Sequence, residues 1–219
     1  IIPGVTIADN TAAMLAAMGI LAALLAREKT GQGRYLDISM LDSVVSWLFD
    51  SVQYQFAEGR APGRSEGRLW GGVPSYGVYE TRDGRYITLG ALEQRFKEQL
   101  LTKLGREDLI EGRGAVTTNI GGEGAEELSV FLKQAFLTRT QQEWVAELED
   151  LNICFAPVNT LGEASEHPQV LHRRMVGEVD QPGAGRTRVI GDPRKVSDPP
   201  VEPGPAPALG EHTVEVLEG

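Results

Sequence analysis

The chain has 219 residues, of which 41% are hydrophobic and 24% charged, and its formal net charge at pH 7 is −10. This length and composition are typical of a soluble globular protein with one or two domains and a sizeable core. The acidic balance argues against a general nucleic-acid binder, which needs a basic face, but it leaves room for an anionic ligand in a local basic pocket.

The N-terminal segment predicts a long apolar helix. Asp9 and Asn10 favour a helix start, and Gly31 follows the last predicted helical position. Every residue from Ala12 to Ala26 is apolar or glycine, so we expect this helix to be buried on nearly all sides. The run is shorter than the roughly 20 apolar residues that a bilayer span needs, and we expect no membrane span and no signal peptide.

Asp9 has two interpretations at this stage. It is either a simple N-cap, which the local sequence favours, or a catalytic carboxylate that the helix N-terminus keeps ionised. Later parts of the chain have to decide between them.

The next segment predicts a strand and a second helix. Apolar and polar side chains alternate over Tyr35–Met40, which is the pattern of a strand. Asp42 or Ser43 can cap a helix that runs to about Glu58, because apolar residues follow at helical spacing.

A glycine-rich loop over Gly59–Pro74 is the best boundary in the sequence. It is either a plain linker or a mobile loop over an active site, with Gly71 and Gly72 as the hinge.

The middle of the chain predicts a β-hairpin followed by a helix. Asp83 and Gly84 form a turn signal between the β-rich runs Tyr76–Thr81 and Arg85–Gly90. Apolar residues at helical spacing then predict a helix over Glu93–Leu104, and Glu93 in its first turn complements the helix dipole.

The remaining elements are predicted from shorter patterns. Thr140 and Glu143 form a capping box that opens a helix, and Cys154 is expected in the core of a short buried strand. The others are a short helix and loop over 106–125, a helix over 128–136, the strand over 153–158, helical turns over 161–164 and 168–175, strands over 176–179 and 187–190, an extended proline-rich stretch over 193–207 and a helix over 209–217.

Most familiar catalytic patterns are missing from the sequence. His167, His172 and His212 lack metal-ligand spacing, so we expect surface or capping roles and no metal site. Because a single cysteine excludes an internal disulfide and fits a reducing compartment, we expect a cytoplasmic protein. No phosphate-binding glycine loop or nucleophile elbow is present, which leaves the carboxylates Asp9 and Glu93.

Several segments, in order along the chain, resemble the class III CoA-transferase family, which includes formyl-CoA and carnitine CoA-transferases, bile-acid-inducible proteins and α-methylacyl-CoA racemase. The matching segments are Ile7-Ala-Asp9, Arg27-Glu-Lys-Thr-Gly-Gln-Gly33, Asp37-Ile-Ser-Met-Leu41, Gly71-Gly-Val-Pro-Ser-Tyr76, Tyr79-Glu-Thr-Arg-Asp-Gly-Arg-Tyr86, Gly90-Ala-Leu-Glu93 with Phe96, Ala156-Pro-Val158, His167-Pro-Gln169 and Leu209-Gly-Glu-His-Thr213.

The resemblance implies that Asp9 is catalytic. In the transferases the matching aspartate attacks an acyl-CoA thioester and carries CoA to an acceptor acid through an aspartyl-CoA intermediate. In the racemases it is one of two bases that move the proton next to the thioester carbonyl, and a glutamate matching Glu93 supports the other base, a histidine. The loop residues Gly71, Gly72 and Tyr76 are expected at the substrate, and coenzyme A enters as part of the substrate with no permanently bound cofactor.

The resemblance also implies an α/β fold with an interlocked homodimer. Residues 1–58 would belong to a large CoA-binding domain, 59–74 to the linker, 75–175 to a small α/β domain, and 176–219 to an extended segment that returns to the large domain. The match covers the latter part of the family's usual length, so we expect a fragment or a processed chain. Such a chain is either an acyl-CoA transferase, a racemase, or a non-catalytic binding module that another chain completes.

Overall fold

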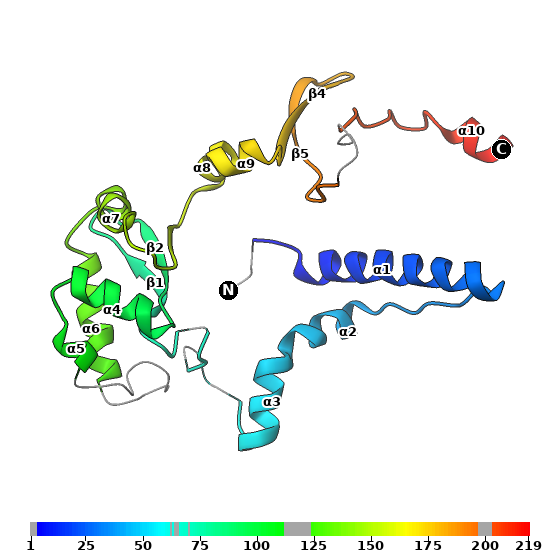
Figure 1. Cartoon of the computed structure of the whole chain (residues 1–219). Helices are drawn as coiled ribbons and strands as arrows, with labels where there is room; N and C mark the ends of the chain where they lie inside the picture. The colour runs from blue at the N-terminus through cyan, green and yellow to red at the C-terminus, as the bar shows by residue number, and fades with distance from the viewer. Residues whose placement is uncertain (1–3, 62, 64–65, 70, 112–123, 197–202) are drawn as a thin grey trace. The chain divides into compact units, whose positions relative to one another are not determined.

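The computed structural model describes residues 4–61, 63, 66–69, 71–111, 124–196 and 203–219. The chain divides into two compact units, Ile1–Ala156 and Pro157–Gly219 (Figure 1). A three-stranded sheet lies in the first unit and a two-stranded sheet in the second. The mixed α/β class is as predicted, whereas the predicted domain boundaries stay predictions.

Helix α1 spans Ile7–Thr30 and ends where the sequence indicates. Gly31 has a φ of 68° in the left-handed region, and its N–H donates to the Arg27 carbonyl at 2.8 Å, which closes the helix. The start differs from the prediction, because Thr6 is the N-cap residue and its side chain makes no capping hydrogen bond. Asp9 is therefore a residue of the first helical turn, and its interpretation as the N-cap is wrong.

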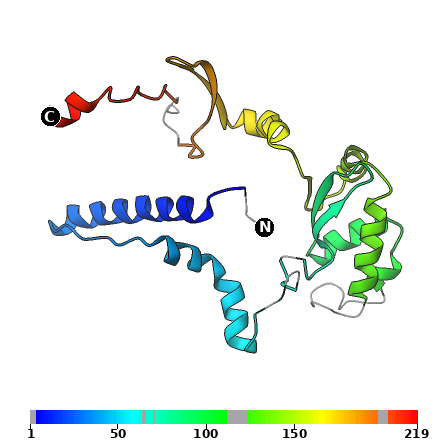
Figure 2. The same ribbon diagram turned by 180° about the vertical axis from the view of Figure 1, so that it is seen from behind.

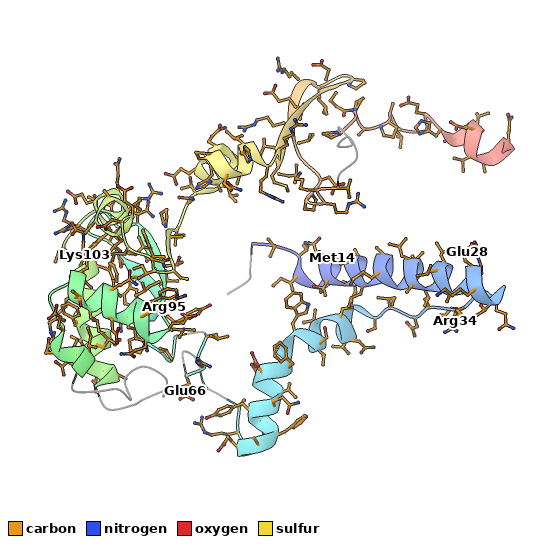
Figure 3. All side chains as sticks on the ribbon, viewed as in Figure 1. Met14, Glu28, Arg34, Glu66, Arg95 and Lys103 are labelled. Carbon is orange, nitrogen blue, oxygen red and sulfur yellow. The ribbon has the colours of Figure 1, made fainter. Side chains whose placement is uncertain are left out.

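The surroundings of α1 also differ from the prediction. Thr11 is its one buried residue, and large apolar side chains such as Met14 are exposed, Met14 by 65% (Figure 3). The chain returning from Gly31 runs alongside the helix in both views (Figures 1 and 2) and brings Leu36 and Ile38 against Gly19. This returning segment and α2 both pack on α1, yet the helix is not buried on nearly all sides as expected.

The segment after α1 is not a strand. Residues 32–39 have no regular secondary structure, although their apolar and polar residues alternate. Alternation sorts side chains between two faces, but a strand also needs a hydrogen-bonded neighbour, and Leu36 and Ile38 instead pack on a helix. The predicted strand over Tyr35–Met40 is therefore wrong.

The second helical region is broken into three pieces. Helix α2 spans Met40–Val45, a 3-10 turn η1 spans Ser46–Leu48, and α3 spans Phe49–Glu58. The cap is Ser39 rather than Asp42 or Ser43, because the Ser39 hydroxyl accepts the N–H of Asp42 at 3.2 Å. As predicted, the region ends at Glu58.

By length and composition, α1 is long and apolar enough to cross a bilayer. This corrects our expectation from the apolar run alone, since the helix extends beyond the run at both ends. A core helix of a soluble protein passes the same test, so the property does not by itself place the chain in a membrane.

The predicted hairpin is confirmed. Strands β1 (Tyr76–Glu80) and β2 (Tyr86–Gly90) pair antiparallel. Asp83 organises the turn, because its carboxylate accepts the Thr81 hydroxyl at 2.6 Å and the Gln141 N–H at 3.2 Å. The short strand β3 (Phe155–Pro157) lies beside β2 in the sheet.

Four helices pack with this sheet to form the small α/β core, a name used here for residues 71–156. They are α4 (Gln94–Lys103), α5 (Asp108–Glu111), α6 (Ala125–Phe136) and α7 (Gln141–Leu148). Phe136 is central, with ring centroids 5.0 Å from Tyr79 and 5.1 Å from Trp144. The predicted capping box of Thr140 and Glu143 opens α7. Much of the predicted loop over 106–125 lies outside the described residues.

Strand β3 is less buried than predicted. Its side chains are half-buried or exposed, and Cys154 is exposed instead of lying in the core. The strand lies at the end of the strand order, so fewer elements cover it than cover β2.

The second unit contains short helices and a hairpin. Its elements are α8 (Leu161–Glu166), α9 (Pro168–His172), β4 (Val176–Gln181), β5 (Gly185–Ile190) and α10 (Thr213–Glu218). The predicted strands are confirmed and are longer than predicted, whereas α10 begins later than the predicted start at residue 209. Of the proline-rich stretch, residues 197–202 lie outside the description.

Candidate active-site cleft

The small α/β core contains a cleft with a cavity volume of about 980 Å³. Its walls come from the glycine-rich loop, the hairpin, the start of α4, one side of α6 and β3. The lining residues are Leu69, Gly71, Val73, Pro74, Tyr76, Gly77, Val78, Tyr79, Thr88, Leu89, Gly90, Leu92, Glu93, Ser129, Lys133, Cys154, Phe155 and Ala156.

Glu93 lines the cleft at the start of α4. The helix begins one residue later than predicted, so Glu93 is the N-cap residue and not a first-turn residue, and its carboxylate makes no capping hydrogen bond. Its backbone is held by the helix, because the Glu93 carbonyl accepts the N–H of Phe96 at 3.0 Å and of Lys97 at 3.2 Å. The Glu93 carboxylate is thus exposed and is not used in capping.

The glycine-rich loop forms one wall of the cleft. Gly71 and Tyr76 line the cavity, whereas Gly72 is not a lining residue. A Cβ atom on Gly72 would lie 2.6 Å from the Glu66 carbonyl oxygen, so this position requires glycine for close packing of the loop. The role of Gly71 and Gly72 as a hinge stays a prediction.

Tyr79 joins the loop to the hairpin. Its hydroxyl donates to the Pro74 carbonyl, and burial raises the pKa of the Tyr79 phenol to about 12. Since a phenol with this pKa stays neutral at physiological pH, it acts as a hydrogen-bond donor that fastens the loop to the sheet.

Lys97 is a buried cation next to Glu93 that the sequence analysis missed. It is 2% exposed, and burial lowers its pKa to about 8, with Arg68 acting in the same direction and Glu93 in the opposite one. Lysine is rarely buried to this degree. The available signal was its position between Phe96 and Leu100, on the apolar side of the predicted helix.

Ser129 and Lys133 were also missed as lining residues of the cleft. They lie one turn apart on α6, which packs against β1. No sequence pattern distinguishes them from other polar residues of an amphipathic helix, because their place in the cleft depends on how α6 packs.

Asp9 lies in the first turn of α1 and is exposed. It is not among the residues that line the cleft, and within the described ranges no hydrogen bond or ion pair links it to Glu93. The structure therefore brings Gly71, Tyr76 and Glu93 to one cavity and leaves Asp9 as a separate carboxylate at a helix N-terminus.

The three histidines are not grouped with other metal-ligating residues. No cluster of three histidine, cysteine, aspartate or glutamate side chains that could hold a metal occurs in the described part of the chain. The His167 Nδ1 accepts the N–H of Gln169 at 3.2 Å at the start of α9, which is the capping role expected for it.

Comparison with known proteins gives consistent relatives over nearly the whole chain. The chain is 32% identical to an acyl-CoA transferase from Fusarium pseudograminearum, covering 98% of this chain and 47% of the relative. It is 34% identical to succinyl-CoA:mesaconate CoA-transferase from Haloarcula marismortui, with shares of 99% and 53%. It is 28% identical to human α-methylacyl-CoA racemase, with shares of 94% and 52%. The chain thus spans about half the length of these curated relatives.

Solved structures share the fold. A mutant of Rv3272 from Mycobacterium tuberculosis superposes with a TM-score of 0.79 at 24% identity, covering 99% of this chain and 56% of that one. A CAIB/BAIF family protein from Brucella suis gives a TM-score of 0.76 at 23% identity, with shares of 100% and 56%. The sequence profile of CoA-transferase family III matches residues 1–213. The chain therefore belongs to CoA-transferase family III, as its sequence motifs indicate.

Proposed function

We propose that the protein processes acyl-CoA thioesters and transfers CoA between acyl groups, with Asp9 as the nucleophile. The observation that carries the proposal is the exposed carboxylate of Asp9 in the first turn of the 24-residue helix α1. A helix N-terminus favours the carboxylate anion, and its backbone N–H groups that lack helical partners can stabilise a developing oxyanion. The named acyl-CoA transferase and CoA-transferase relatives support this reaction class.

The reaction follows from the chemistry of a carboxylate and a thioester. Asp9 attacks the thioester carbonyl, which breaks the C–S bond, releases CoA thiolate and forms a mixed anhydride. The thiolate then attacks the Asp9 carbonyl, which releases the donor acid and leaves an aspartyl-CoA thioester. The acceptor carboxylate attacks this thioester, which breaks its C–S bond, releases CoA thiolate and forms a new anhydride. The thiolate then attacks the acceptor's acyl carbon, which releases the new acyl-CoA and the free carboxylate of Asp9.

A second candidate function is racemisation of a 2-methylacyl-CoA, with Asp9 as a base for the α-proton. Two observations favour it: the 28% identity to human α-methylacyl-CoA racemase over 94% of this chain, and the position of Glu93 in the cleft. A base of this kind forms no covalent adduct, so the two functions differ in a measurable intermediate.

A third candidate is that another chain completes the site. The chain spans about half the length of its curated relatives, and apolar side chains of α1 such as Leu21 and Leu25 are 67% and 63% exposed. A long exposed apolar helix face suits an interface, so we propose a homodimer, with light scattering after gel filtration as its test. A cytoplasmic location is also a proposal.

The experiment that separates these functions follows adduct formation and proton exchange on the same protein. The 219-residue chain is incubated with a panel of acyl-CoAs, quenched with hydroxylamine and mapped by mass spectrometry, and a parallel sample in deuterated water is followed for α-proton exchange. CoA transfer predicts a hydroxamate at Asp9, whereas racemisation predicts exchange without an adduct.

The matched control is Asp50→Asn, which removes another first-turn aspartate, in α3. Asp9→Asn abolishes either activity, whereas Asp50→Asn leaves it unchanged. Full activity in Asp9→Asn would contradict both catalytic functions, and inactivity of the wild-type chain with every acyl-CoA would favour the third candidate.

A further inference from the structure

The second unit contains a cavity of about 630 Å³ whose charged lining is mainly basic. Its basic lining residues are His172, Arg173, Arg174, Arg194 and Lys195, and one carboxylate, Asp192, accompanies them. We call this the basic cavity. It is made by the end of α9 and by the chain that follows β5, and it lies entirely within residues 157–219.

The backbone is built to hold these two segments together. The N–H of Gly191 donates to the Met175 carbonyl at 3.0 Å, directly next to the arginine pair at 173 and 174. A Cβ atom on Gly191 would lie 2.1 Å from the Arg174 carbonyl oxygen, so only glycine permits this approach. Arg174 itself has a φ of 50°, a left-handed conformation that non-glycine residues rarely adopt. This close, strained crossing places the two basic segments on one cavity.

The single carboxylate of the cavity is already engaged. The Asp192 carboxylate accepts a hydrogen bond from the Arg194 Nε at 2.9 Å and another from the Arg194 Nη2 at 2.6 Å. The Lys195 Nζ donates to the Asp192 backbone carbonyl at 2.5 Å. The Arg194 guanidinium holds the pKa of Asp192 at about 2, so this carboxylate stays ionised and offsets one positive charge.

The charge of Arg173 is not offset by an ion pair of this kind. On the neighbouring hairpin, Arg186 pairs with Glu178, and Arg188 pairs with Glu166 at 2.5 Å. Arg173, in contrast, has no ion pair with any residue that the structure describes. Gathering like charges is unfavourable unless an anion offsets them, and this gathering occurs in a chain whose net charge is −10.

We propose that the basic cavity binds the phosphate groups of a small phosphorylated ligand. Guanidinium forks match phosphate oxygens in bidentate geometry, and a multiply charged phosphate matches the excess of positive charge better than a monocarboxylate does. The volume accommodates a diphosphate together with part of the molecule that carries it. Phosphate binding in this cavity does not require the carboxylate chemistry of Asp9.

The test is calorimetric titration of the 219-residue chain with sodium pyrophosphate near neutral pH and at low salt. We expect saturable binding that weakens as salt is added. The double variant Arg173→Gln and Lys195→Gln should weaken binding by about tenfold or more, because it removes two of the charged donors that would bind the phosphate oxygens. Both side chains are exposed, and circular dichroism verifies that the variant folds.

The matched control is the double variant Arg186→Gln and Arg188→Gln, which removes the same number of charges from the hairpin outside the cavity. It should change the affinity by less than about threefold. Absence of saturable pyrophosphate binding, or an equal loss in both double variants, would overturn the proposal.

A further arm identifies the source of the phosphate. Adenosine 3′,5′-bisphosphate, the nucleotide end of coenzyme A, is titrated in parallel with pyrophosphate. Binding at least about tenfold tighter than that of pyrophosphate would identify a CoA-type nucleotide as the ligand. Similar binding of the two would identify a free phosphate compound, and both results support the site.

Discussion

Lys97 lies one helical turn after Glu93 on α4, and its backbone N–H donates to the Glu93 carbonyl at 3.2 Å. The two residues have opposite surroundings, because the Lys97 side chain is buried whereas Glu93 is exposed in the cleft. The N-terminal end of the helix thus presents a carboxylate to the cavity and buries a cation one turn later.

Burial of Lys97 predicts a specific dependence of stability on pH. Its pKa is about 8 in the folded protein and 10.5 ordinarily, so the unfolded chain binds more protons between these values. Lys97 should therefore make the free energy of unfolding increase as pH rises from about 8 toward 10.5. Urea denaturation at several pH values in this window should show the slope in wild type and not in Lys97→Met. The control Lys103→Met, at a partly exposed lysine of the same helix, should keep it. Equal slopes in wild type and Lys97→Met would contradict the prediction.

The raised pKa of Tyr79 should make stability decrease with pH, at higher pH than the effect of Lys97. Because its pKa is raised from 10.0 to about 12, the folded state retains the phenolic proton longer than the unfolded chain does. Its contribution to stability is complete below pH 10 and is lost as pH rises toward 12. Tyr79→Phe should remove this alkaline loss and cost about 1 kcal/mol at neutral pH through the lost hydrogen bond to Pro74. Tyr86→Phe, at an exposed tyrosine, serves as the control. An unchanged alkaline profile in Tyr79→Phe would argue against this assignment.

We expect that the glycine-rich loop cannot accept a side chain at Gly72 without a loss of stability. The added methyl group of Gly72→Ala would clash with the Glu66 carbonyl at 2.6 Å, and backbone cannot move aside as cheaply as a side-chain end. We expect a loss of about 1–3 kcal/mol in the free energy of unfolding, measured by urea denaturation. The control is Gly33→Ala, whose new Cβ would meet nothing within 4 Å and should change stability by less than about 0.5 kcal/mol. Equal stability of the two variants would show that the loop relaxes.

Substitution of Glu93 should have different effects under the two catalytic functions, racemisation and CoA transfer. If proton movement is the reaction, Glu93→Gln should slow α-proton exchange by about tenfold or more, because a carboxylate that supports a base is lost. If CoA transfer is the reaction, formation of the Asp9 adduct should be nearly unaffected. Glu98→Gln, at an exposed position on the same helix, is the matched control. A loss of adduct formation in Glu93→Gln alone would assign Glu93 a role in transfer.

Local signals predicted a substantial part of the fold. The Asp83-Gly84 turn, the capping box of Thr140 and Glu143, and the helix stop at Gly31 are all found where predicted. Each depends on hydrogen bonds or on φ values within a few residues, which is information that a short stretch of sequence contains.

The wrong predictions share a physical cause. Alternation over Tyr35–Met40 resembled a strand, and the hydrophobic run over 153–158 that contains Cys154 resembled core, but both depended on what packs against them. The apolar run of α1 likewise indicates that the helix needs a cover without indicating what that cover is. In this chain the segment that follows Gly31 and helix α2 supply part of that cover.

The sequence by itself determined the family, the hairpin, most helix ends and the two carboxylates of interest, because motifs and caps are local patterns. Only the tertiary structure decided that Gly71, Tyr76 and Glu93 share one cavity, that Lys97 is buried, and that Arg173 and Lys195 line a second cavity. These juxtapositions join residues from different elements. They arise from helix packing and from a glycine contact between distant segments, neither of which a short sequence pattern records.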